Sequence, residues 1–503
     1  MLTLLAYAAM SQKPVVPAPT IWADVPDISV VRVGRDYYMS STTMHMNPGV
    51  PIMKSRDLVN WRTVSYCYDN LGSSPRQDLA DGKNEYGKGT WASSLRFHEG
   101  VFYCSTFSNT TNKTYIFSTK TPDKGPWKKI EFSPGVHDHS LVFDAGKAYL
   151  IHGVGKIRIQ ELKDDLSGLK PGGLDQVLIQ DAAAPTGAKA GLMGEGSQMF
   201  KVNGKYYLFN IVWPRGGIRT QVVHRADSLL GPYEGRVVLA DQGIAQGGIV
   251  DTPDGRWYAY LFGDRGAVGR IPYILPMRWE DGWPVVGPGA KIPVDAALLP
   301  TQTDLKGIVR SDEFRGKKLG IEWQWNHNPD SSLWSLGDRP GSLRLRSGGV
   351  ATEVTQARNT LTQRTFGPTC TGTVKLDFSQ LKDGDTAGLL ALMGKYGYAG
   401  VRRMGDVREV VMVSATSGKP EVVTAVPISG SEIYLRMTCD FRKQVDLCSF
   451  AYSLDGKRWL DLGQPIRLRY ELGHFMGCRF GLFNWATTES GGSADFDFFR
   501  IGS

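Results

Sequence analysis

Short runs of alternating apolar and polar residues, separated by turns that contain glycine, fill the first three fifths of the chain. Five segments share one order: a turn, one or two residues that are mostly aromatic, a tyrosine, and then apolar residues. They are GRDYYMSS, EGVFYCST, AGKAYLIHG, NGKYYLFN and DGRWYAYLF, with the shared tyrosines Tyr38, Tyr103, Tyr149, Tyr207 and Tyr258. Such alternation predicts strands, and several short strands repeated about every 50 residues are typical of a β-propeller. We therefore expect a five-bladed β-propeller over residues 19–295.

A second all-β unit is expected over residues 310–503, where this repeat is absent. Segments such as SLRLRS, GTVKLDFS, EIYLRMTCDF and ADFDFFRIG alternate with a period of two, which predicts an antiparallel β-sandwich. The length of 503 residues agrees with two domains, because a single core stops growing at about 250–300 residues.

Composition excludes several other classes of protein. No apolar run reaches the ~18 residues of a membrane-spanning helix, so no membrane partner is expected. The net charge is +8, but the basic residues are scattered, so no nucleic-acid partner is expected either. The 59 glycines and the many aromatic residues favour a turn-rich β protein.

The chain begins with an apolar stretch that turns proline-rich, MLTLLAYAAMSQKPVVPAP. Residues 1–18 resemble the end of a secretory signal without its basic start. This predicts a secreted or periplasmic protein, with a cytoplasmic location as the alternative.

Six cysteines are too few for a disulfide scaffold. Cys439 and Cys448 flank the segment FRKQVDL, so they either face each other across a hairpin as a pair or remain free buried thiols.

The repeat places five side chains at equivalent positions, eleven or twelve residues before each shared tyrosine: Asp27, Trp91, Asp138, Glu195 and Gln246. Since the innermost strands of a propeller line its central channel, equivalent positions in different blades converge on the axis. One acidic residue before a strand is often only a turn residue, but three carboxylates in register indicate a functional site.

Converging carboxylates have pKa values that are pushed apart, so one can act as a base while another holds a proton. Hydrolysis of a glycosidic bond needs such a pair. Binding of Ca²⁺ by carboxylate oxygens is the competing chemistry.

The same segments resemble glycoside hydrolase family 43, over nearly the whole chain. WADVPDISVVRVGRDYYMSSTT resembles the opening motif of the family and implies that Asp27 is the general base, although Ile28 replaces the usual proline. VHDHSLVFDAGKAYLIHG and GEGSQMFKVNGKYYLF resemble the third and fourth blades. They imply that Asp138 tunes the pKa of the acid and orients it, and that Glu195 is the general acid.

The resemblance also implies the sugar-binding residues. WASSLRFHEGVFYCSTFS places Trp91 in the sugar pocket, and the fifth-blade segment implies that Arg270 binds the sugar in the minus-one subsite. Many relatives carry a histidine that holds a channel ion where this chain has Ala245, so such an ion is doubtful here, while Gln246 still lines the channel.

Family members invert the anomeric centre. This implies carboxyl groups of Asp27 and Glu195 separated by roughly 6.5–9.5 Å, with room for a water molecule. No catalytic cofactor is implied.

Further candidates are less specific. His45 and Met46 are expected to edge the pocket. The second domain resembles the concanavalin-like jelly roll that follows the propeller in some family members, and a loop of it, with residues 485–493 as the candidate, is expected to close over the pocket. Asp312 and Asp497 are candidate ligands of a structural Ca²⁺ in the sandwich.

The resemblance implies an exo-acting glycosidase that releases terminal β-1,4-xylosyl units from xylan-derived oligosaccharides. An α-L-arabinofuranosidase acting on arabinoxylan or arabinan side chains is the nearest alternative. A non-catalytic sugar-binding propeller is the alternative of a different class.

Overall fold

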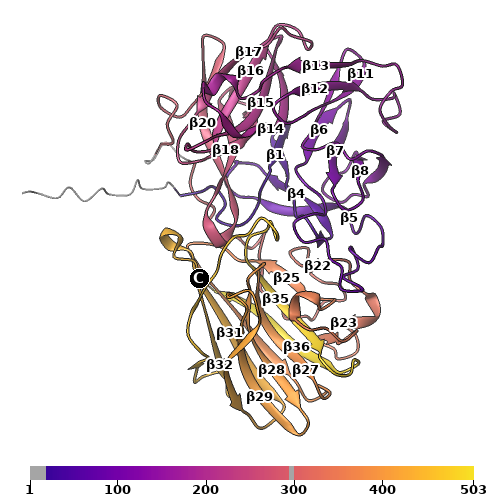
Figure 1. Ribbon diagram of the computed structural model, residues 1–503, viewed down its shortest axis with the longest axis vertical. Helices are drawn as coiled ribbons and strands as arrows, with labels where there is room; N and C mark the ends of the chain where they lie inside the picture. Colours follow the sequence, from indigo (N-terminus) through magenta and orange to yellow (C-terminus); the bar gives the residue numbers. More distant parts are fainter. Residues whose placement is uncertain (1–17, 294–298, 503) are drawn as a thin grey trace, which may run out of the picture.

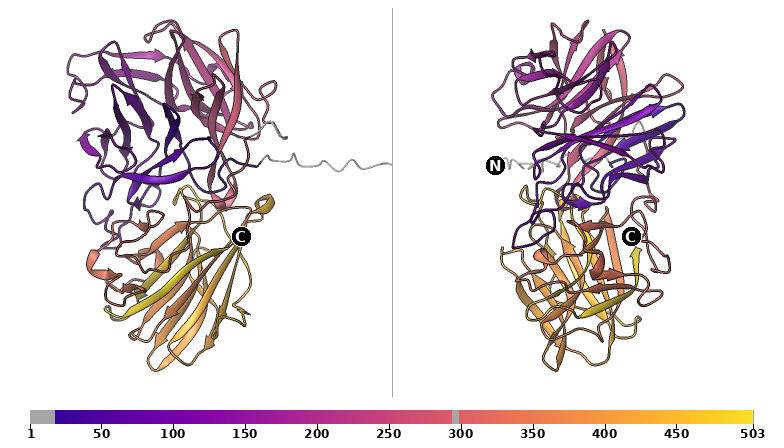
Figure 2. Two further views of the ribbon diagram at one scale, coloured as in Figure 1. Left: turned by 180° about the vertical axis from the view of Figure 1, so that it is seen from behind. Right: turned by 90° about the vertical axis from the view of Figure 1, so that its right-hand side faces the viewer.

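The computed structural model describes residues 18–293 and 299–502, and the predicted five-bladed β-propeller and β-sandwich are confirmed in them (Figure 1). The propeller lies at one end of the molecule and the sandwich at the other, an arrangement also seen from behind and from the side (Figure 2). The described residues contain no α-helix, and none of their helical segments is long and apolar enough to cross a membrane. The predicted signal remnant falls mostly on residues 1–17, outside the described residues.

Each blade is a four-stranded antiparallel sheet whose first strand is innermost. The strands, blade by blade, are β1 (Ser29–Val33), β2 (Asp36–Ser40), β4 (Gly49–Ser55) and β5 (Arg62–Tyr68); β6 (Ser94–His98), β7 (Val101–Ser108), β8 (Lys113–Thr119) and β9 (Lys128–Phe132); β10 (Ser140–Asp144), β11 (Lys147–His152), β12 (Ile157–Glu161) and β13 (Asp175–Ile179); β14 (Ala190–Val202), β15 (Lys205–Pro214), β16 (Thr220–Ala226) and β17 (Glu234–Leu239); β18 (Ala245–Asp251), β19 (Trp257–Asp264), β20 (Arg270–Glu280) and β21 (Trp283–Val286).

The repeated tyrosines mark the second strand of every blade. Tyr38 is paired with Val31 of the inner strand, Tyr149 with Val142, and Tyr258 with Val250, and the remaining two follow the same register. The segment around Thr20 closes the ring, because its backbone N–H and its hydroxyl bond to β20 of the fifth blade.

The sandwich consists of two large sheets. The first has the order β3 (Met46–Asn47), β22 (Gln324–Asn326), β25 (Leu361–Arg364), β35 (Arg479–Ala486), β27 (Asp385–Leu392), β28 (Gly397–Met404), β29 (Val407–Ser414) and β30 (Glu421–Pro427). The second has the order β23 (Trp334–Ser335), β24 (Leu343–Arg346), β36 (Ser493–Gly502), β26 (Thr369–Asp377), β31 (Glu432–Asp440), β32 (Leu447–Ser453) and β33 (Leu460–Asp461), with β34 (Ile466–Arg467) also paired to β32. Short 3-10 turns occur at η1 (Ala184–Thr186), η2 (Gly266–Val268), η3 (Ser331–Leu333), η4 (Val354–Gln356) and η5 (Arg442–Gln444).

Alternation along the sandwich strands builds the core between the sheets. In β26 and β31 every second residue is buried, including Val374, Leu376, Leu435 and Met437, while the residues between them are partly exposed. This is the period of two expected for strands with one face on a core. Cys439 lies between Cys370 and Cys448 in neighbouring strands, and all six cysteines are free and buried.

The two domains share a sheet. Strand β3 comes from the first blade, yet it pairs with β22 at the edge of the sandwich, with Asn47 opposite Trp325. The buried carboxylate of Asp24, just before the first blade, accepts backbone hydrogen bonds from Arg270 of the fifth blade and from Gly477 of the sandwich (2.8 and 2.9 Å). A loop of the sandwich is therefore fixed against the end of the propeller that carries Asp24 and Arg270.

Candidate active site

Three of the five register positions share an unusual backbone conformation. Asp27, Asp138 and Gln246 have φ angles of 52°, 43° and 62°, in the left-handed region that residues other than glycine rarely adopt. Each lies at or just before the start of the innermost strand of its blade. Left-handed residues of this kind cost about 1–3 kcal/mol and cluster at functional sites. Here the shared turn directs equivalent side chains towards the axis.

Glu195 reaches the same region through an irregular strand. The pairing of β14 with β15 shifts on both sides of Glu195, and the flanking Gly194 and Gly196 have φ angles of 110° and 64°. A bulge of this type re-aims a side chain. A Cβ atom on Gly196 would lie 2.9 Å from the side chain of Gln246, so glycine is required where the two blades meet.

Asp27 forms a buried ion pair with Arg270. The Nη1 atom of Arg270 lies 2.9 Å from both carboxylate oxygens, and the Gln246 amide donates to Oδ1 at 3.1 Å. Burial raises the pKa of Asp27, and the charge and hydrogen bonds of Arg270 oppose this rise. Within the described residues, Nε and Nη2 of Arg270 are buried and have no hydrogen-bond partner, so they remain as donors for a ligand.

His137 joins the other two carboxylates. Its Nε2 atom lies 3.1 Å from Oε2 of Glu195 and 3.5 Å from Oδ2 of Asp138. Burial raises the pKa of Asp138 to about 7, with the nearby charge of Glu195 adding to the rise and that of His137 opposing it. Burial lowers the pKa of His137, but the hydrogen bond with Glu195 and the charge of Asp138 outweigh it and raise this pKa to about 9. His137 was not among the residues predicted from the sequence, although it directly precedes Asp138.

Aromatic rings form the wall beside these groups. Trp91 contacts His137 and Phe475, with ring centroids 5.5 and 5.2 Å apart, and the guanidinium of Arg270 lies over the ring of Phe475 at 4.4 Å. Phe475 belongs to the sandwich and is two residues from Gly477, which Asp24 holds. No sequence pattern in the propeller signalled this contribution.

His45 and Met46 support this wall from behind, which corrects the prediction that they edge the pocket. Both are fully buried, because their segment pairs with the sandwich as β3. His45 packs against three rings at the interface of the domains: Tyr86, His327 and His474, with centroids 4.7, 4.9 and 5.1 Å away. The apolar cluster containing Met46 packs against Trp91 and Phe475.

The calcium site predicted in the sandwich is not supported either, because the two aspartates have separate protein partners. Asp312 accepts hydrogen bonds from the backbone of Phe314 and the indole of Trp323. Asp497 pairs with Lys375 at 2.8 Å and accepts from Ser342. A cation that the chain itself supplies already balances the charge of Asp497.

The loop prediction was wrong in its position. Residues 485–493 pack on the sandwich, where Thr487 and Gly491 bond to the backbone of Gly384 and to Ser347. The sandwich segment that reaches the propeller is the one around Phe475.

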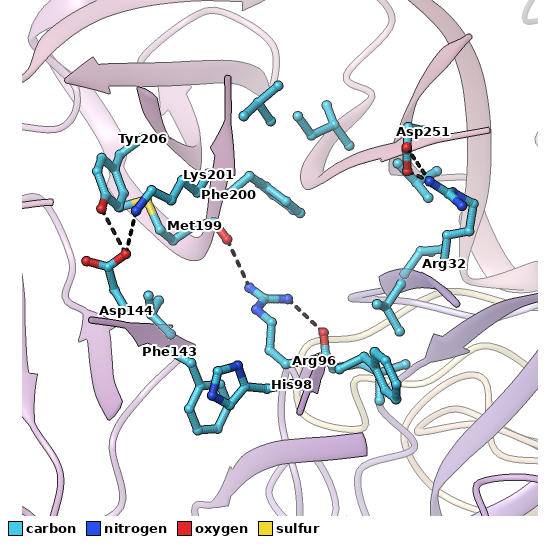
Figure 3. Close-up of a pocket in the computed structure, with 18 of the residues that line it drawn as sticks. Arg32, Arg96, His98, Phe143, Asp144, Met199, Phe200, Lys201, Tyr206 and Asp251 are labelled. Carbon is cyan, nitrogen blue, oxygen red and sulfur yellow. Dashed lines mark hydrogen bonds and ion pairs between the residues drawn. The ribbon is translucent and has the colours of Figure 1, made fainter. Parts of the chain in front are cut away.

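The opposite mouth of the channel holds a separate pocket of about 320 Å³, formed by the far ends of the five innermost strands (Figure 3). Ion pairs of Arg32 with Asp251 and of Lys201 with Asp144 lie at its sides. In its centre Arg96 donates to backbone carbonyls and to the side chain of Gln198 (3.0 Å). Gln198 in turn lines a small void beside Asp27 and Asp138, so Arg96 separates the two ends of the channel.

Ala245 stands where many relatives have a histidine that holds a channel ion. Its side chain is buried and has no donor atom for an ion.

A five-bladed propeller with three carboxylates gathered at one end of its channel is an arrangement that suits a glycoside hydrolase. The sequence model of "Glycosyl hydrolases family 43" matches residues 16–284, and that of the "Beta xylosidase C-terminal Concanavalin A-like domain" matches residues 311–502. The chain therefore belongs to glycoside hydrolase family 43, as the sequence motifs indicated.

Relatives and solved structures agree with this assignment. The chain is 30% identical to "Beta-xylosidase" of Formosa agariphila, covering 96% of this chain and 89% of the relative. It is 28% identical to "Non-reducing end alpha-L-arabinofuranosidase" of Bacteroides ovatus, covering 74% and 72%. A structure titled "Bifunctional GH43-CE Bacteroides eggerthii" superposes with a TM-score of 0.95 at 57% identity over 98% of this chain. This chain spans 64% of that bifunctional protein.

Proposed function

We propose that the protein is an inverting exo-glycosidase that removes terminal β-1,4-xylosyl units from xylan-derived oligosaccharides. The observation that supports this best is the buried pair of Asp27 and Arg270. Without a cation, a carboxyl group at this depth would hold its proton, whereas the contact with Arg270 favours the charged form that a general base needs. Glu195 is on a different blade and is partly exposed, so a leaving group can reach it.

In the proposed reaction Asp27 takes a proton from a water molecule as its oxygen attacks the anomeric carbon. Glu195 gives a proton to the glycosidic oxygen as that bond breaks. A single displacement of this kind inverts the anomeric centre and needs a water-sized gap between the carboxyl groups. His137 contacts Glu195, and Asp138 contacts His137. Together these two residues hold the acid in place.

The aromatic wall on one side of the site favours attack at a chain end. Trp91 and Phe475 close one side, and the unpaired Nε and Nη2 atoms of Arg270 are placed to bind hydroxyl groups of one terminal sugar. The relative from Formosa agariphila, which is named a β-xylosidase, supports this substrate class.

The α-L-arabinofuranosidase alternative rests on the Bacteroides ovatus relative that carries this name. A terminal arabinofuranosyl unit presents a similar set of hydroxyl groups to the same donors, so the two substrates are compared directly.

The test measures kcat/KM on xylan-derived oligosaccharides, aryl β-D-xyloside and aryl α-L-arabinofuranoside for the wild type, Asp27→Ala, Glu195→Ala and the control Asp251→Ala. Asp251 is a carboxylate on an innermost strand at the opposite mouth of the channel. We expect both site variants to lose at least about 10³-fold in kcat/KM on xylan-derived oligosaccharides, and the control to keep its activity. If Glu195 is the acid, its variant retains more activity on the aryl substrates, whose leaving groups need no proton.

Nuclear magnetic resonance of the first sugar released gives the stereochemistry. Initial formation of α-xylose from a β-xyloside supports inversion, and initial formation of β-xylose rejects it. If the wild type binds xylo-oligosaccharides but hydrolyses neither aryl substrate, the non-catalytic sugar-binding alternative holds instead.

We also propose that the protein is exported from the cytoplasm, on the basis of the N-terminal sequence alone. Fractionation of cells that express the full chain tests this, and recovery of all of the protein in the cytoplasm would contradict it.

A further inference from the structure

We propose that His137, Asp138 and Glu195 form a binding site for a divalent transition-metal ion such as Zn²⁺, and that the bound ion blocks hydrolysis. One ligand atom from each residue lies within 4.8 Å of the other two. Nε2 of His137 lies 3.1 Å from Oε2 of Glu195 and 3.5 Å from Oδ2 of Asp138. A tetrahedral zinc ion with bonds of about 2.0–2.1 Å separates its ligand atoms by roughly 3.3 Å. These two separations lie on either side of that value.

The donor set suits zinc. Imidazole nitrogen and carboxylate oxygen are both ordinary zinc ligands, and sites with three protein ligands leave a fourth position for water. Calcium prefers six to eight oxygen ligands and magnesium an octahedron, so neither is served by one imidazole and two carboxylates. The ion would take the place of the hydrogen bond between His137 and Glu195.

A second observation is a buried polar atom without a partner beside the cluster. Asp138 is 95% buried, and its Oδ1 atom has no hydrogen-bond partner within the described residues. A buried carboxylate oxygen without a partner is costly unless a cation or a donor reaches it.

The site is also ordered and open. The ring of His137 is held by edge contacts with Trp91 and Phe107, at centroid distances of 5.5 and 5.2 Å. The side chains of His137 and Glu195 keep 34% and 20% of their surface exposed, so an ion can enter from the pocket. Preorganised ligands with solvent access favour binding without rearrangement of the fold.

The blocking effect, though not the binding, rests on the proposed function. An oxygen of Glu195 that coordinates zinc cannot carry the proton for the leaving group, and Asp138 can no longer act on Glu195. Hydrolysis should therefore fall in proportion to the fraction of protein that holds the ion. In the absence of zinc the enzyme is expected to be fully active.

The experiment measures zinc binding by the full chain after dialysis against a chelator, using isothermal titration with zinc chloride. The wild type, His137→Gln, Asp138→Asn and the control His98→Gln are compared. His98 is a partly exposed histidine at the opposite mouth of the channel. We expect one ion per chain in the wild type and in His98→Gln. We expect at least about 10-fold weaker binding in His137→Gln and Asp138→Asn, because loss of even an outer-shell partner of a metal ligand costs that much.

Circular dichroism melting of each variant establishes that it is folded, and a variant that does not fold is replaced by His137→Asn. Equal zinc affinity in the wild type and the His137 variant, or no binding by the wild type, overturns the proposal. So does calcium binding as tight as zinc binding at this site.

Parallel assays with an aryl glycoside separate this proposal from the proposed function. Zinc should inhibit the wild type and His98→Gln at the concentrations that saturate the titration, and calcium should not inhibit. Zinc that binds through His137 but leaves hydrolysis unchanged rejects the blocking effect. A protein that hydrolyses no glycoside yet binds zinc through His137 rejects the proposed function and retains the metal site.

Discussion

Replacement of Arg270 tests the central feature of the site, because this side chain pairs with the proposed general base and is proposed to bind the sugar. In Arg270→Met, Asp27 loses two charge-assisted contacts of 2.9 Å while it stays buried. A hydrogen bond to a charged group contributes about 1.5–3 kcal/mol. Since 1.36 kcal/mol corresponds to one pKa unit, the pKa of Asp27 should rise by about 1–2 units. The acidic limb of the profile of kcat/KM against pH should move upward by the same amount.

A second effect is independent of pH. The Nε and Nη2 atoms of Arg270 have no protein partner within the described residues, so their loss removes donors to the substrate. We expect the plateau of kcat/KM to fall by a further ~10–100-fold, from about 1.5–3 kcal/mol of charged hydrogen bonding. Arg270→Lys keeps a cation beside Asp27 but loses the fork, so its acidic limb should move less while its plateau still falls.

The assay is the initial rate of aryl glycoside hydrolysis from acidic to neutral pH, with Arg32→Met as the control. Arg32 of the first blade pairs with Asp251 of the fifth blade, at the opposite mouth of the channel. An acidic limb of Arg270→Met that coincides with that of the wild type would refute the reasoning. So would a shift in Arg270→Lys as large as that in Arg270→Met.

Three further predictions concern two residues of the sandwich and the cysteines of both domains. Phe475→Ala should lower kcat/KM by about 3- to 30-fold without shifting the pH limbs, because it loses the cation–π contact with Arg270, worth about 0.5–2 kcal/mol; unchanged kinetics would show that this ring has no part in the site. Burial lowers the pKa of His474 to about 3, so below its ordinary value of 6.5 the unfolded state binds a proton that the folded state does not, and stability falls as the pH falls. Of the groups that face it, Arg479 opposes its charge, and the rings of His45 and Tyr86 pack against its ring. Denaturant unfolding should therefore show His474→Gln losing about 2 kcal/mol less than the wild type between pH 6.5 and pH 5, and equal losses would contradict this. Because the described cysteines are free, a reducing agent should leave the melting temperature of the protein unchanged, and a clear decrease would indicate a disulfide.

The sequence was informative wherever the repeat carried the signal. Asp27, Asp138, Glu195 and Gln246 were found because each occupies the same place in a blade, and the register of a propeller converts that place into a common position. Arg270 followed from the resemblance to the family. The fold class followed from the period of two and from the spacing of the tyrosines.

The remaining features depend on contacts between distant parts of the chain. Phe475 lies in the second domain, and nothing local indicates that its ring faces Trp91. His45 and Met46 follow the first blade motif and were expected at the pocket. Instead, Met46 and Asn47 pair with the sandwich, and this pairing buries His45 and Met46. Asp312 and Asp497 looked like calcium ligands because a sequence does not show which lysine or indole will reach them.

The shared sheet also has a consequence for biosynthesis. Strand β3 is made early, with the first blade, whereas its partner β22 and the segment of Phe475 follow about 280 and 430 residues later. Domains generally fold as they emerge from the ribosome, but contacts of such large sequence separation form late. A ribosome-bound chain that has completed the propeller should thus hold all three carboxylates of the proposed site and still lack activity. Hydrolysis would begin only after the C-terminal sandwich has left the exit tunnel and docked.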